Sequence, residues 1–274
     1  MKLDLHVHTT ASDGSVKPAR VARMAAAAGI GVLAVADHDT IGGIAEASAE
    51  APPSLRVVPA IEISCAVGEL NIHLLGYFVD PAHPGLVAHS RRVIELREAR
   101  MRTMIELLAG MGIPVEYDAV RLEAGAEAVL GRPHLARTLV ATGAVPTVGR
   151  AFELYLADRA PAWVPVEAVD LEEAAAIVHA AGGIAVWAHP SADALDARID
   201  AFREQGLDGV ECIRARATPM EVERGLAATR ARSLIPTGGS DWHGTWHGRL
   251  GDFTVGAEQI PEFVELLEAR IPPV

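Results

Sequence analysis

The sequence predicts an α/β fold, either a parallel barrel or a doubly wound sheet, with a helical segment inserted into it. The 274 residues are 50% apolar and 22% charged, which is enough to bury a large core and excludes intrinsic disorder. Short apolar runs alternate with helix-like stretches along most of the chain, as they do in βαβ units. This alternation stops between about residues 81 and 165, where strand character is nearly absent.

Each predicted strand is a short apolar run of the kind that is buried on both faces of a parallel sheet. These runs cover residues 3–7, 31–36, 56–63, 72–78, 184–188, 209–212 and 234–237. The first predicted helix starts at Pro18, because proline is favoured at the first helical position, and it stops at Gly29. Further helices of the α/β body are expected at residues 171–181, 193–205, 219–230 and 261–270.

Residues 81–164 are predicted to form a helical insertion that interrupts a body made of residues 1–80 and 165–274. One long helix is expected at residues 86–109, followed by shorter helices separated by Gly and Pro. Helical spacing defines the expected inner stripe of the long helix, which comprises Arg97, Met101, Met104 and Leu108.

Charge and composition exclude several classes of function. The net charge is −12, from 24 Lys and Arg against 36 Asp and Glu, and this argues against a broad face for long nucleic acids. Aromatic residues make up only 4% of the chain, too few for a platform that stacks long single strands. A phosphorylated ligand is compatible with the acidic charge, because bound cations would reverse the local sign. Nothing in the sequence indicates an oligomeric state.

The sequence also indicates where the protein resides. It contains no run of 18 apolar residues, so we expect no membrane span. Residues 2–5 lead directly into a polar motif, so no targeting segment is expected. Cys65 and Cys212 are too few for a disulfide framework and are predicted to be reduced core thiols of a cytoplasmic protein.

Histidines and acidic residues recur where the predicted strands end. His6 and His8 are two residues apart on the first strand, so both side chains point to one side and can reach one ion. Asp241 and His243 form a second pair with this spacing after the last strand. The other residues at strand ends, or in the turns that follow them, are Asp13, His38, Glu62, His73 and His189. The carboxyl ends of strands are where α/β barrels build their sites.

This set of side chains predicts a metal centre with several ions. The six histidines, together with Asp13, Glu62 and Asp241, exceed the ligands that one ion needs and suffice for three open sites. Because no cysteine belongs to the set, we expect Mn, Fe or Zn bound by nitrogen and oxygen. Each residue alone is equally explained as a core histidine or a turn residue, but the recurrence favours metal. Histidines without ligand-like partners are predicted to lie at the surface, namely His83, His89, His179 and His247.

The motifs resemble the PHP (polymerase and histidinol phosphatase) family, within the amidohydrolase-like barrels. The matching residues are His6-Val7-His8-Thr9, Ser12-Asp13-Gly14, Asp37-His38-Asp39, Glu62-Ile63-Ser64, His189-Pro190 and Gly239-Ser240-Asp241-Trp242-His243. The resemblance covers about residues 1–80 and 165–274. It implies a distorted (β/α)7 TIM-like barrel and three divalent ions that serve phosphoester hydrolysis, with manganese as the first choice and iron or zinc as alternatives.

The resemblance also implies how the ligands are shared. The first ion would be held by His6, His8, Glu62 and Asp241. Glu62 would bridge to a second ion, which would be completed by His73 and His189. The third ion would grip the phosphoryl oxygens, and its ligands are the predicted catalytic residues Asp13, His38 and His243. His134 is an alternative to His189 on the second ion, or a phosphate contact or acid reaching from the insertion.

Two further segments, residues 71–77 and 131–136, resemble a narrower subgroup of the family. This subgroup comprises stand-alone bacterial phosphoesterases, among them a nucleoside 3',5'-bisphosphate phosphatase and a short-RNA 5'-exonuclease. The arginines of the insertion either pair with neighbouring glutamates on a solvated face or clamp a second phosphate. The predicted substrate-binding residues are Arg97, Arg100, Arg132 and His134.

The sequence therefore predicts a metal-dependent phosphatase that acts on a small phosphorylated nucleotide. The first expectation is removal of the 3'-phosphate from nucleoside 3',5'-bisphosphates, which gives nucleoside 5'-monophosphate and phosphate. The alternatives are a 5'-to-3' exonuclease on short RNA, a histidinol-phosphate phosphatase, and a catalytically silent metal-binding module. Neither long nucleic acid nor a membrane is expected as a partner.

Overall fold

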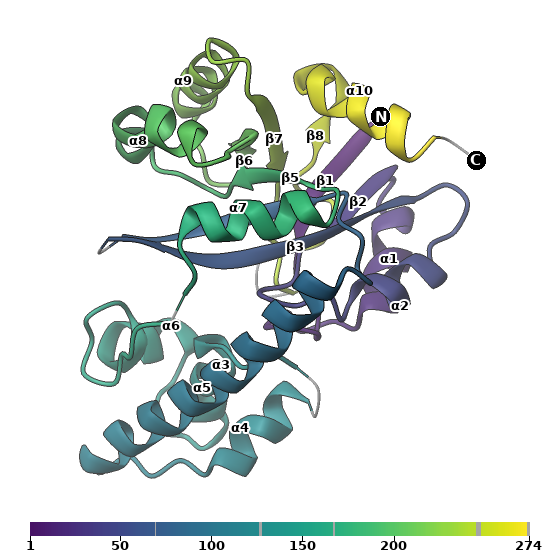
Figure 1. Cartoon of the computed structure of the whole chain (residues 1–274). Coiled ribbons are helices and arrows are strands. Elements are labelled where there is room, and N and C mark those ends of the chain that lie inside the picture. Colours follow the sequence, from purple (N-terminus) through teal and green to yellow (C-terminus); the bar gives the residue numbers. More distant parts are fainter. Residues whose placement is uncertain (69, 126–127, 167, 245–247, 273–274) are drawn as a thin grey trace.

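The computed structural model describes residues 1–68, 70–125, 128–166, 168–244 and 248–272, and within them eight strands form one sheet. The strand order is β7-β6-β5-β4-β3-β2-β1-β8 (Figure 1). The strands are β1 (Lys2–Val7), β2 (Val32–Val35), β3 (Arg56–Val67), β4 (Leu70–Tyr77), β5 (Ile184–Trp187), β6 (Gly209–Arg214), β7 (Ile235–Gly239) and β8 (Val255–Gly256). The first seven coincide with the seven predicted apolar runs, and β8 is additional.

The sheet curls into a nearly closed barrel. The amide of His8 at the end of β1 donates to the carbonyl oxygen of Trp242, just after β7, at 2.9 Å. This contact brings together the two strands that are furthest apart in the order of the seven-stranded body. The predicted α/β barrel is therefore confirmed, and the carboxyl ends of β1 and β7 lie side by side.

The expectation of a purely parallel sheet is wrong at β4 and β8. β4 runs antiparallel to both β3 and β5, and β8 runs antiparallel to β1. β3 ends at Val67 and β4 begins at Leu70, so a hairpin joins them, whereas a parallel pair needs a crossover of a dozen residues or more. Gly68 has a φ of +62°, a left-handed conformation that glycine adopts without steric cost.

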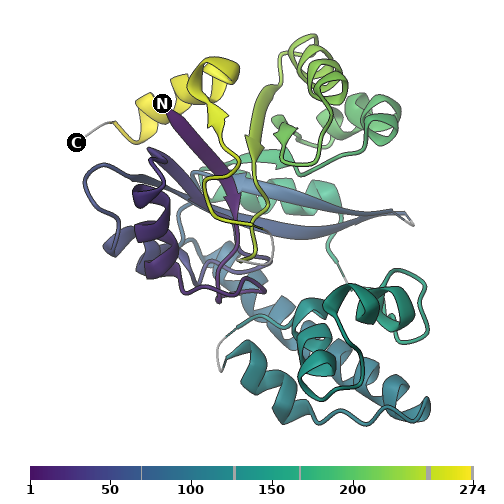
Figure 2. The ribbon, with the colours of Figure 1, turned by 180° about the vertical axis from the view of Figure 1, so that it is seen from behind.

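Helices cover the outside of the barrel (Figures 1 and 2). They are α1 (Pro18–Ala27), α2 (Ile44–Ala49), α7 (Leu171–Ala180), α8 (Ala192–Glu204), α9 (Pro219–Arg230) and α10 (Pro261–Arg270), with the 3-10 helix η3 (Ala257–Gln259) before α10. All were predicted except η3 and α2, which is too short to show helical periodicity. Within the described residues, no helix has the length and apolar character needed to cross a membrane.

Between β4 and α7 the chain forms a group of helices that lies at one end of the molecule (Figures 1 and 2). Its elements are α3 (Pro84–Gly110), α4 (Tyr117–Ala124), α5 (Arg132–Ala141), α6 (Val148–Ala151) and the π-helix η1 (Phe152–Leu156). This group, called the insertion below, has an apolar core of its own. The residues of the predicted inner stripe of α3 are all buried, namely Arg97, Met101, Met104 and Leu108.

The main apolar core fills the space between the sheet and its helices and includes Cys65 and Cys212. Both cysteines are buried and unpaired, as predicted. Burial raises the pKa of the Cys212 thiol to about 11, so this thiol stays protonated at neutral pH.

Candidate metal centre and active site

Strand β1 divides its side chains between the two faces of the barrel wall. Leu3 and Leu5 pack into the main apolar core. The residues between and after them, Asp4, His6 and His8, point the other way because side chains alternate along a strand. All three polar side chains are buried. Two imidazoles are thus delivered to the mouth of the barrel from one short segment.

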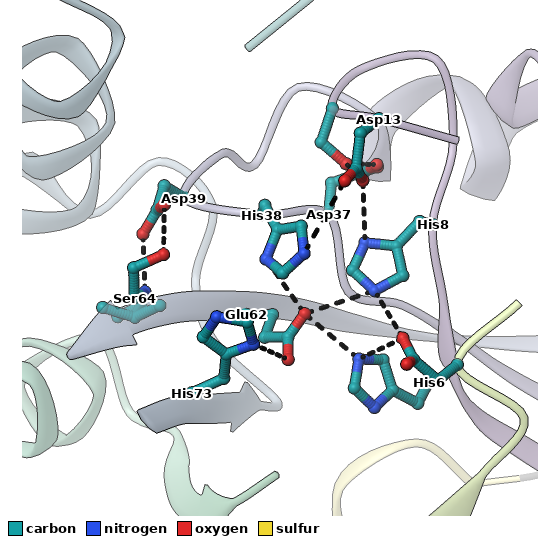
Figure 3. A network of polar contacts seen from close by, with 12 residues as sticks. His6, His8, Asp13, Asp37, His38, Asp39, Glu62, Ser64 and His73 are labelled. Atoms are coloured by element: carbon teal, nitrogen blue, oxygen red, sulfur yellow. Dashed lines mark hydrogen bonds and ion pairs between the residues drawn. The ribbon is translucent and has the colours of Figure 1, made fainter. Parts of the chain in front are cut away.

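Glu62 on β3 lies at the centre of the cluster (Figure 3). Its carboxylate is fully buried, and five imidazoles surround it, two from strands β1 and β4 and three from the segments that follow β1, β2 and β5. Nitrogens of His6 and His8 lie 3.2 Å from Oε2, and Nδ1 of His38 lies 3.0 Å from the same oxygen. Nδ1 of His73 and Nε2 of His189 lie 2.9 and 3.1 Å from Oε1.

Asp241 and Asp13 close the cluster from the loops after β7 and β1. Oδ1 of Asp241 is 3.2 Å from Nε2 of His8 and 3.5 Å from Nε2 of His6. Oδ1 of Asp13 is 3.3 Å from Nε2 of His243. Each side chain that was predicted from strand-end positions as a metal ligand therefore lies in this one cluster.

The close approach of β1 and β7 depends on a glycine. A Cβ at Gly239 would lie 2.5 Å from Cβ and the backbone nitrogen of His6. Any larger residue at this position would push β7 away from β1 and separate Asp241 from the imidazoles that it faces.

The cluster contains three groups of side chains whose ligand atoms lie within 4.8 Å of one another. They are His6-His8-Glu62-Asp241, His8-Asp13-His38-His243 and His38-Glu62-His73. Within the described residues, several of these buried atoms have no hydrogen-bond partner, among them Nε2 of His6, both ring nitrogens of His8 and Oε2 of Glu62. Buried polar atoms left unpaired in this way are what divalent cations satisfy, so the donor set fits metal ions.

The charges in the cluster also indicate that it binds metal ions. Burial opposes protonation of His6 and His8, but the surrounding carboxylates outweigh it. Asp241 and Glu62 raise the pKa of His8 to about 10, and Glu62 and Glu211 raise that of His6. The carboxylates therefore require positive charge among them, which bound cations can supply in place of protons.

His189, and not His134, lies beside Glu62 and His73. Nε2 of His189 is 3.2 Å from Nδ1 of His73, and both rings face the same carboxylate oxygen. His134 is buried at the start of α5, where its Nδ1 accepts a hydrogen bond from the amide of Gly131 at 3.0 Å. Burial lowers the pKa of His134 to about 4, so its ring is neutral and holds the insertion against the loop that carries Asp13.

Three further acids hold the loops that present the ligands. Asp37 accepts hydrogen bonds from the amide and hydroxyl of Thr9 and from the hydroxyl of Ser12, at 2.6–2.7 Å. Asp4 accepts from the amide and hydroxyl of Ser240 at 2.9 and 2.7 Å. Asp39 accepts from the amide and hydroxyl of Ser64 at 2.7 and 2.8 Å. The hydroxyls of Ser12 and Ser64 thus serve to hold the backbone near the ligands, through hydrogen bonds to Asp37 and Asp39.

Arg97, predicted as a substrate contact, is buried in a bridge between the insertion and the barrel. Its Nε and Nη2 donate to Asp39, its Nη2 also donates to Ser64, and its Nη1 donates to the carbonyl oxygen of Leu130. Burial opposes ionisation of Asp39, but the Arg97 guanidinium holds the pKa of that carboxyl well below its usual range. We therefore assign Arg97 a role in joining the two parts of the protein.

His89 corrects a second expectation. It was placed at the surface, but it is 5% exposed, and its Nε2 lies 3.6 Å from Oδ1 of Asp39. The reason is that α3 crosses the end of β2 with this face inward. His179 is exposed, as predicted, and pairs with Asp208. His83 is half-buried and its ring accepts a hydrogen bond from the amide of Gly85, and His247 lies outside the described residues.

Arg100 and Arg132 remain available for an anion. Arg100 is 8% exposed, and within the described residues it uses only Nε, which donates to the carbonyl oxygen of Val164 at 2.7 Å. Burial, together with the charges of Arg97 and Arg132, lowers its pKa to about 9. In the part of the chain that the structure describes, Arg132 donates through Nη1, to the carbonyl oxygen of Leu156 and in an ion pair with Asp158.

Glu211 on β6 is a site residue that the sequence analysis missed. It is 1% exposed; its Oε1 lies 2.9 Å from Nδ1 of His6, and its Oε2 accepts from the amide of His189 at 2.9 Å. One acid in the otherwise apolar run of residues 209–212 was the available signal, because a carboxylate in a buried strand needs a partner.

Comparisons with known proteins agree with this geometry. No family model matches the chain. The chain is 35% identical over 279 residues to a 5'-3' exoribonuclease of Haemophilus influenzae, covering 99% of this chain and 97% of that protein. It is 32% identical over 254 residues to a 3',5'-nucleoside bisphosphate phosphatase of Chromobacterium violaceum, covering 90% and 88%.

Solved structures show the same relationship. A protein of Bifidobacterium adolescentis described as a metal-dependent phosphoesterase superposes with a TM-score of 0.83 at 30% identity, covering 98% of this chain and 96% of that one. A two-domain protein of Bacteroides vulgatus with a PHP-like domain shares the fold at a TM-score of 0.51 and 13% identity, covering 91% of this chain and 54% of that one.

The barrel, the ligand cluster and these similarities define a metal-dependent phosphoesterase of the PHP family, and the chain belongs to that family. It is a hydrolase of phosphate esters. The relatives that match most of its length include the exoribonuclease and the nucleoside bisphosphate phosphatase.

Proposed function

We propose that the protein removes the 3'-phosphate of nucleoside 3',5'-bisphosphates and releases nucleoside 5'-monophosphate and inorganic phosphate. The observation that carries this proposal is a metal-ligand cluster that the insertion contacts, together with a buried arginine on that insertion. The insertion reaches the cluster through Arg137, which donates to the carbonyl oxygen of Asp13, and it carries Arg100, whose two terminal nitrogens have no partner within the described residues. A small molecule with two phosphates matches both features.

We propose that three divalent ions occupy the cluster, with manganese as the first choice and iron or zinc as alternatives. Bound divalent ions supply charge neutralisation for the phosphoryl oxygens and an activated water. The first group of ligands comprises His6, His8, Glu62 and Asp241, and the second comprises Glu62, His73 and His189. The third, Asp13, His38 and His243, lies nearest the insertion, because the backbone of Asp13 accepts from Arg137. These three residues are the proposed catalytic set.

The protein itself contributes orientation and proton control. Glu62 and Asp241 hold the imidazoles of His6 and His8 toward the ions, and buried Asp37 fixes the loop that carries Asp13. Burial lowers the pKa of His38 to about 3, so its ring stays neutral and available as a ligand. His243 is nearly buried, its Nδ1 lies 2.9 Å from the carbonyl oxygen of Asp241 and its Nε2 lies 3.3 Å from Oδ1 of Asp13, so Nε2 is the atom that faces the third group of ligands.

The insertion, residues 81–164, is proposed to bind the second phosphate through Arg100 and Arg132. Arginine presents a planar fork that matches phosphate oxygens, and both residues keep donors unused within the described part of the chain. His134 supports this surface from the start of α5. Histidinol phosphate has a single phosphate and would leave these arginines unused. A short-RNA exonuclease is the second candidate, favoured by the similarity to the exoribonuclease.

The buried, unpaired thiols of Cys65 and Cys212 support a proposed location in the cytoplasm, where thiols stay reduced.

Steady-state kinetics on adenosine 3',5'-bisphosphate and on an aryl phosphate test the role of Arg100. Arg100→Ala should raise KM for the bisphosphate about tenfold or more, the usual effect of losing one charged hydrogen bond, and should leave KM for the aryl phosphate nearly unchanged. Arg91→Ala, an exposed arginine on the same helix, is the matched control. Equal effects of Arg100→Ala on both substrates would contradict the assignment, and no turnover of the bisphosphate by the metal-loaded wild type would overturn the proposed function.

A further inference from the structure

A second pocket lies beside the metal-ligand cluster, and no predicted site residue explains its character. Its volume is about 160 Å³, and it is bounded by the ligands His189 and Asp241 on one side and by Arg214 and Arg216 on the other. Arg214 is the last residue of β6, and Arg216 follows in the loop before α9. Two guanidinium groups of the barrel itself therefore face the edge of the cluster.

This pocket lies across the mouth from the insertion. The insertion contacts the segment after β1 through the amide of Val129 on the carbonyl oxygen of Ala11, and Arg97 contacts Asp39 after β2 and Ser64 on β3. The pocket instead lies where β5, β6 and β7 end. Because the strands follow one another around the barrel, the two places flank the metal-ligand cluster on opposite sides.

Within the described residues, the charges of these two arginines are not neutralised by ion pairs. Neither guanidinium lies within 4.0 Å of a carboxylate in that part of the chain, and the buried Nε of Arg214 has no hydrogen-bond partner there. The acids nearby are engaged elsewhere. Glu211 faces His6 and accepts from His189, and Glu221 on α9 accepts from the amide and hydroxyl of Thr218. Glu211 and Asp241 also line the pocket, so these arginines have acids nearby. A partly buried guanidinium that forms no ion pair within the described residues is a place where an anion is stabilised.

We propose that Arg214 and Arg216 bind a phosphodiester of the substrate on the side of the scissile phosphate opposite to the insertion. The inference rests on the proposed function, in which the scissile phosphate lies at the metal-ligand cluster. A nucleoside bisphosphate has one additional phosphate, and Arg100 and Arg132 bind it. Only an oligonucleotide carries phosphates on both sides of the scissile one. A short oligonucleotide would therefore contact the arginines on both sides of the cluster, whereas the mononucleotide would contact only those of the insertion.

The test compares two substrates with variants of the pocket. Arg214→Ala and Arg216→Ala should each raise KM for a 5'-phosphorylated trinucleotide about tenfold, while KM for adenosine 3',5'-bisphosphate changes less than twofold. Arg214→Lys should recover part of the loss, because it keeps the charge without the planar fork. Arg198→Ala, an exposed arginine on α8, is the matched control and should change neither substrate. Since Arg216 is exposed, its variant should fold even if Arg214→Ala does not.

Binding of a fluorescently labelled 5'-phosphorylated trinucleotide in the presence of a chelator gives a readout that is independent of catalysis. Fluorescence anisotropy should show a Kd about tenfold higher for either alanine variant. Unchanged trinucleotide KM and Kd, or equal increases for the trinucleotide and the bisphosphate, would overturn the proposal. Failure of the wild type to hydrolyse the bisphosphate would count against the proposed function alone, since the anisotropy measurement still decides whether the arginines bind the oligonucleotide.

Discussion

Glu211 shows how one side chain outside the ligand set controls it. Its two oxygens serve two different ligands, through Nδ1 of His6 and through the backbone amide of His189. With Nδ1 of His6 donating to Glu211, the lone pair of that ring lies on Nε2, the atom that faces Glu62 and Asp241. His189 has a φ of +33°, uncommon for a residue with a side chain, and the bond from its amide stabilises this conformation.

Glu211→Gln should weaken metal binding about 10- to 100-fold with little change in overall fold. Glutamine offers one acceptor oxygen where two donors need one each, so its amide nitrogen must face either His6 or His189. Competition with a chelator measures the metal affinity, and circular dichroism of the metal-free protein checks the fold. Glu223→Gln makes the same change at an exposed position of α9 and is the control. Wild-type affinity in Glu211→Gln would show that the carboxylate does not position the ligands.

At the scale of secondary-structure elements, a buried ion pair joins the insertion to the barrel. Arg97 on α3 reaches Asp39, which follows His38 at the end of β2, and Asp39 in turn holds Ser64 at the end of β3. The side chains of Arg97 and Asp39 are 7% and 0% exposed. A buried pair of this kind is costly to break, because the remaining charge is left without compensation.

Arg97→Met should lower the free energy of unfolding by about 3–5 kcal/mol, measured by urea denaturation, because it strands the buried carboxylate of Asp39. Arg91→Met, on the exposed side of the same helix, should change it by less than about 0.5 kcal/mol. Adding Asp39→Asn to Arg97→Met should restore part of the lost free energy of unfolding, because it removes the uncompensated charge of Asp39. Equal stability of the Arg97→Met and Arg91→Met variants would contradict the bridging role.

The sequence predicts most elements because their signals are local. The seven apolar runs, Pro18 at the start of α1 and the inner stripe of α3 each depend on a few neighbouring residues. The antiparallel direction of β4 depends instead on the hairpin at Gly68, which is too short for a crossover. The two-residue strand β8 and the six-residue helix α2 are too short to show a period.

The residues of the site also fall into those that the sequence predicts and those that it does not. Position at or after the carboxyl end of a parallel strand identifies most of the histidines and acids, because those ends meet at one mouth. His73 differs, because it lies on the antiparallel strand β4. The partners of Arg97 could not be predicted, since Asp39 is 58 residues away in the sequence and only the tertiary fold brings the two together. Glu211 and Arg214 were missed for a similar reason: their importance lies in what they face, and spacing along one strand carries no such information.

At the scale of the whole molecule, an acidic protein presents a charged mouth of mixed sign. The net charge of −12 disfavours long nucleic acids. At the mouth, Arg214 and Arg216 line a pocket beside the carboxylates and imidazoles, and the insertion on the other side carries Arg100 and Arg132. This combination suits cations at the centre and phosphates of a short ligand around them.

Metal analysis of the purified protein after reconstitution with Mn²⁺ and gel filtration tests this account most directly. The wild-type chain should retain about three ions, the number proposed from its three groups of donor side chains, and Asp13→Asn should retain about one fewer. Retention of less than one ion per wild-type chain, with Mn²⁺, Fe²⁺ and Zn²⁺ each tried, would contradict the account.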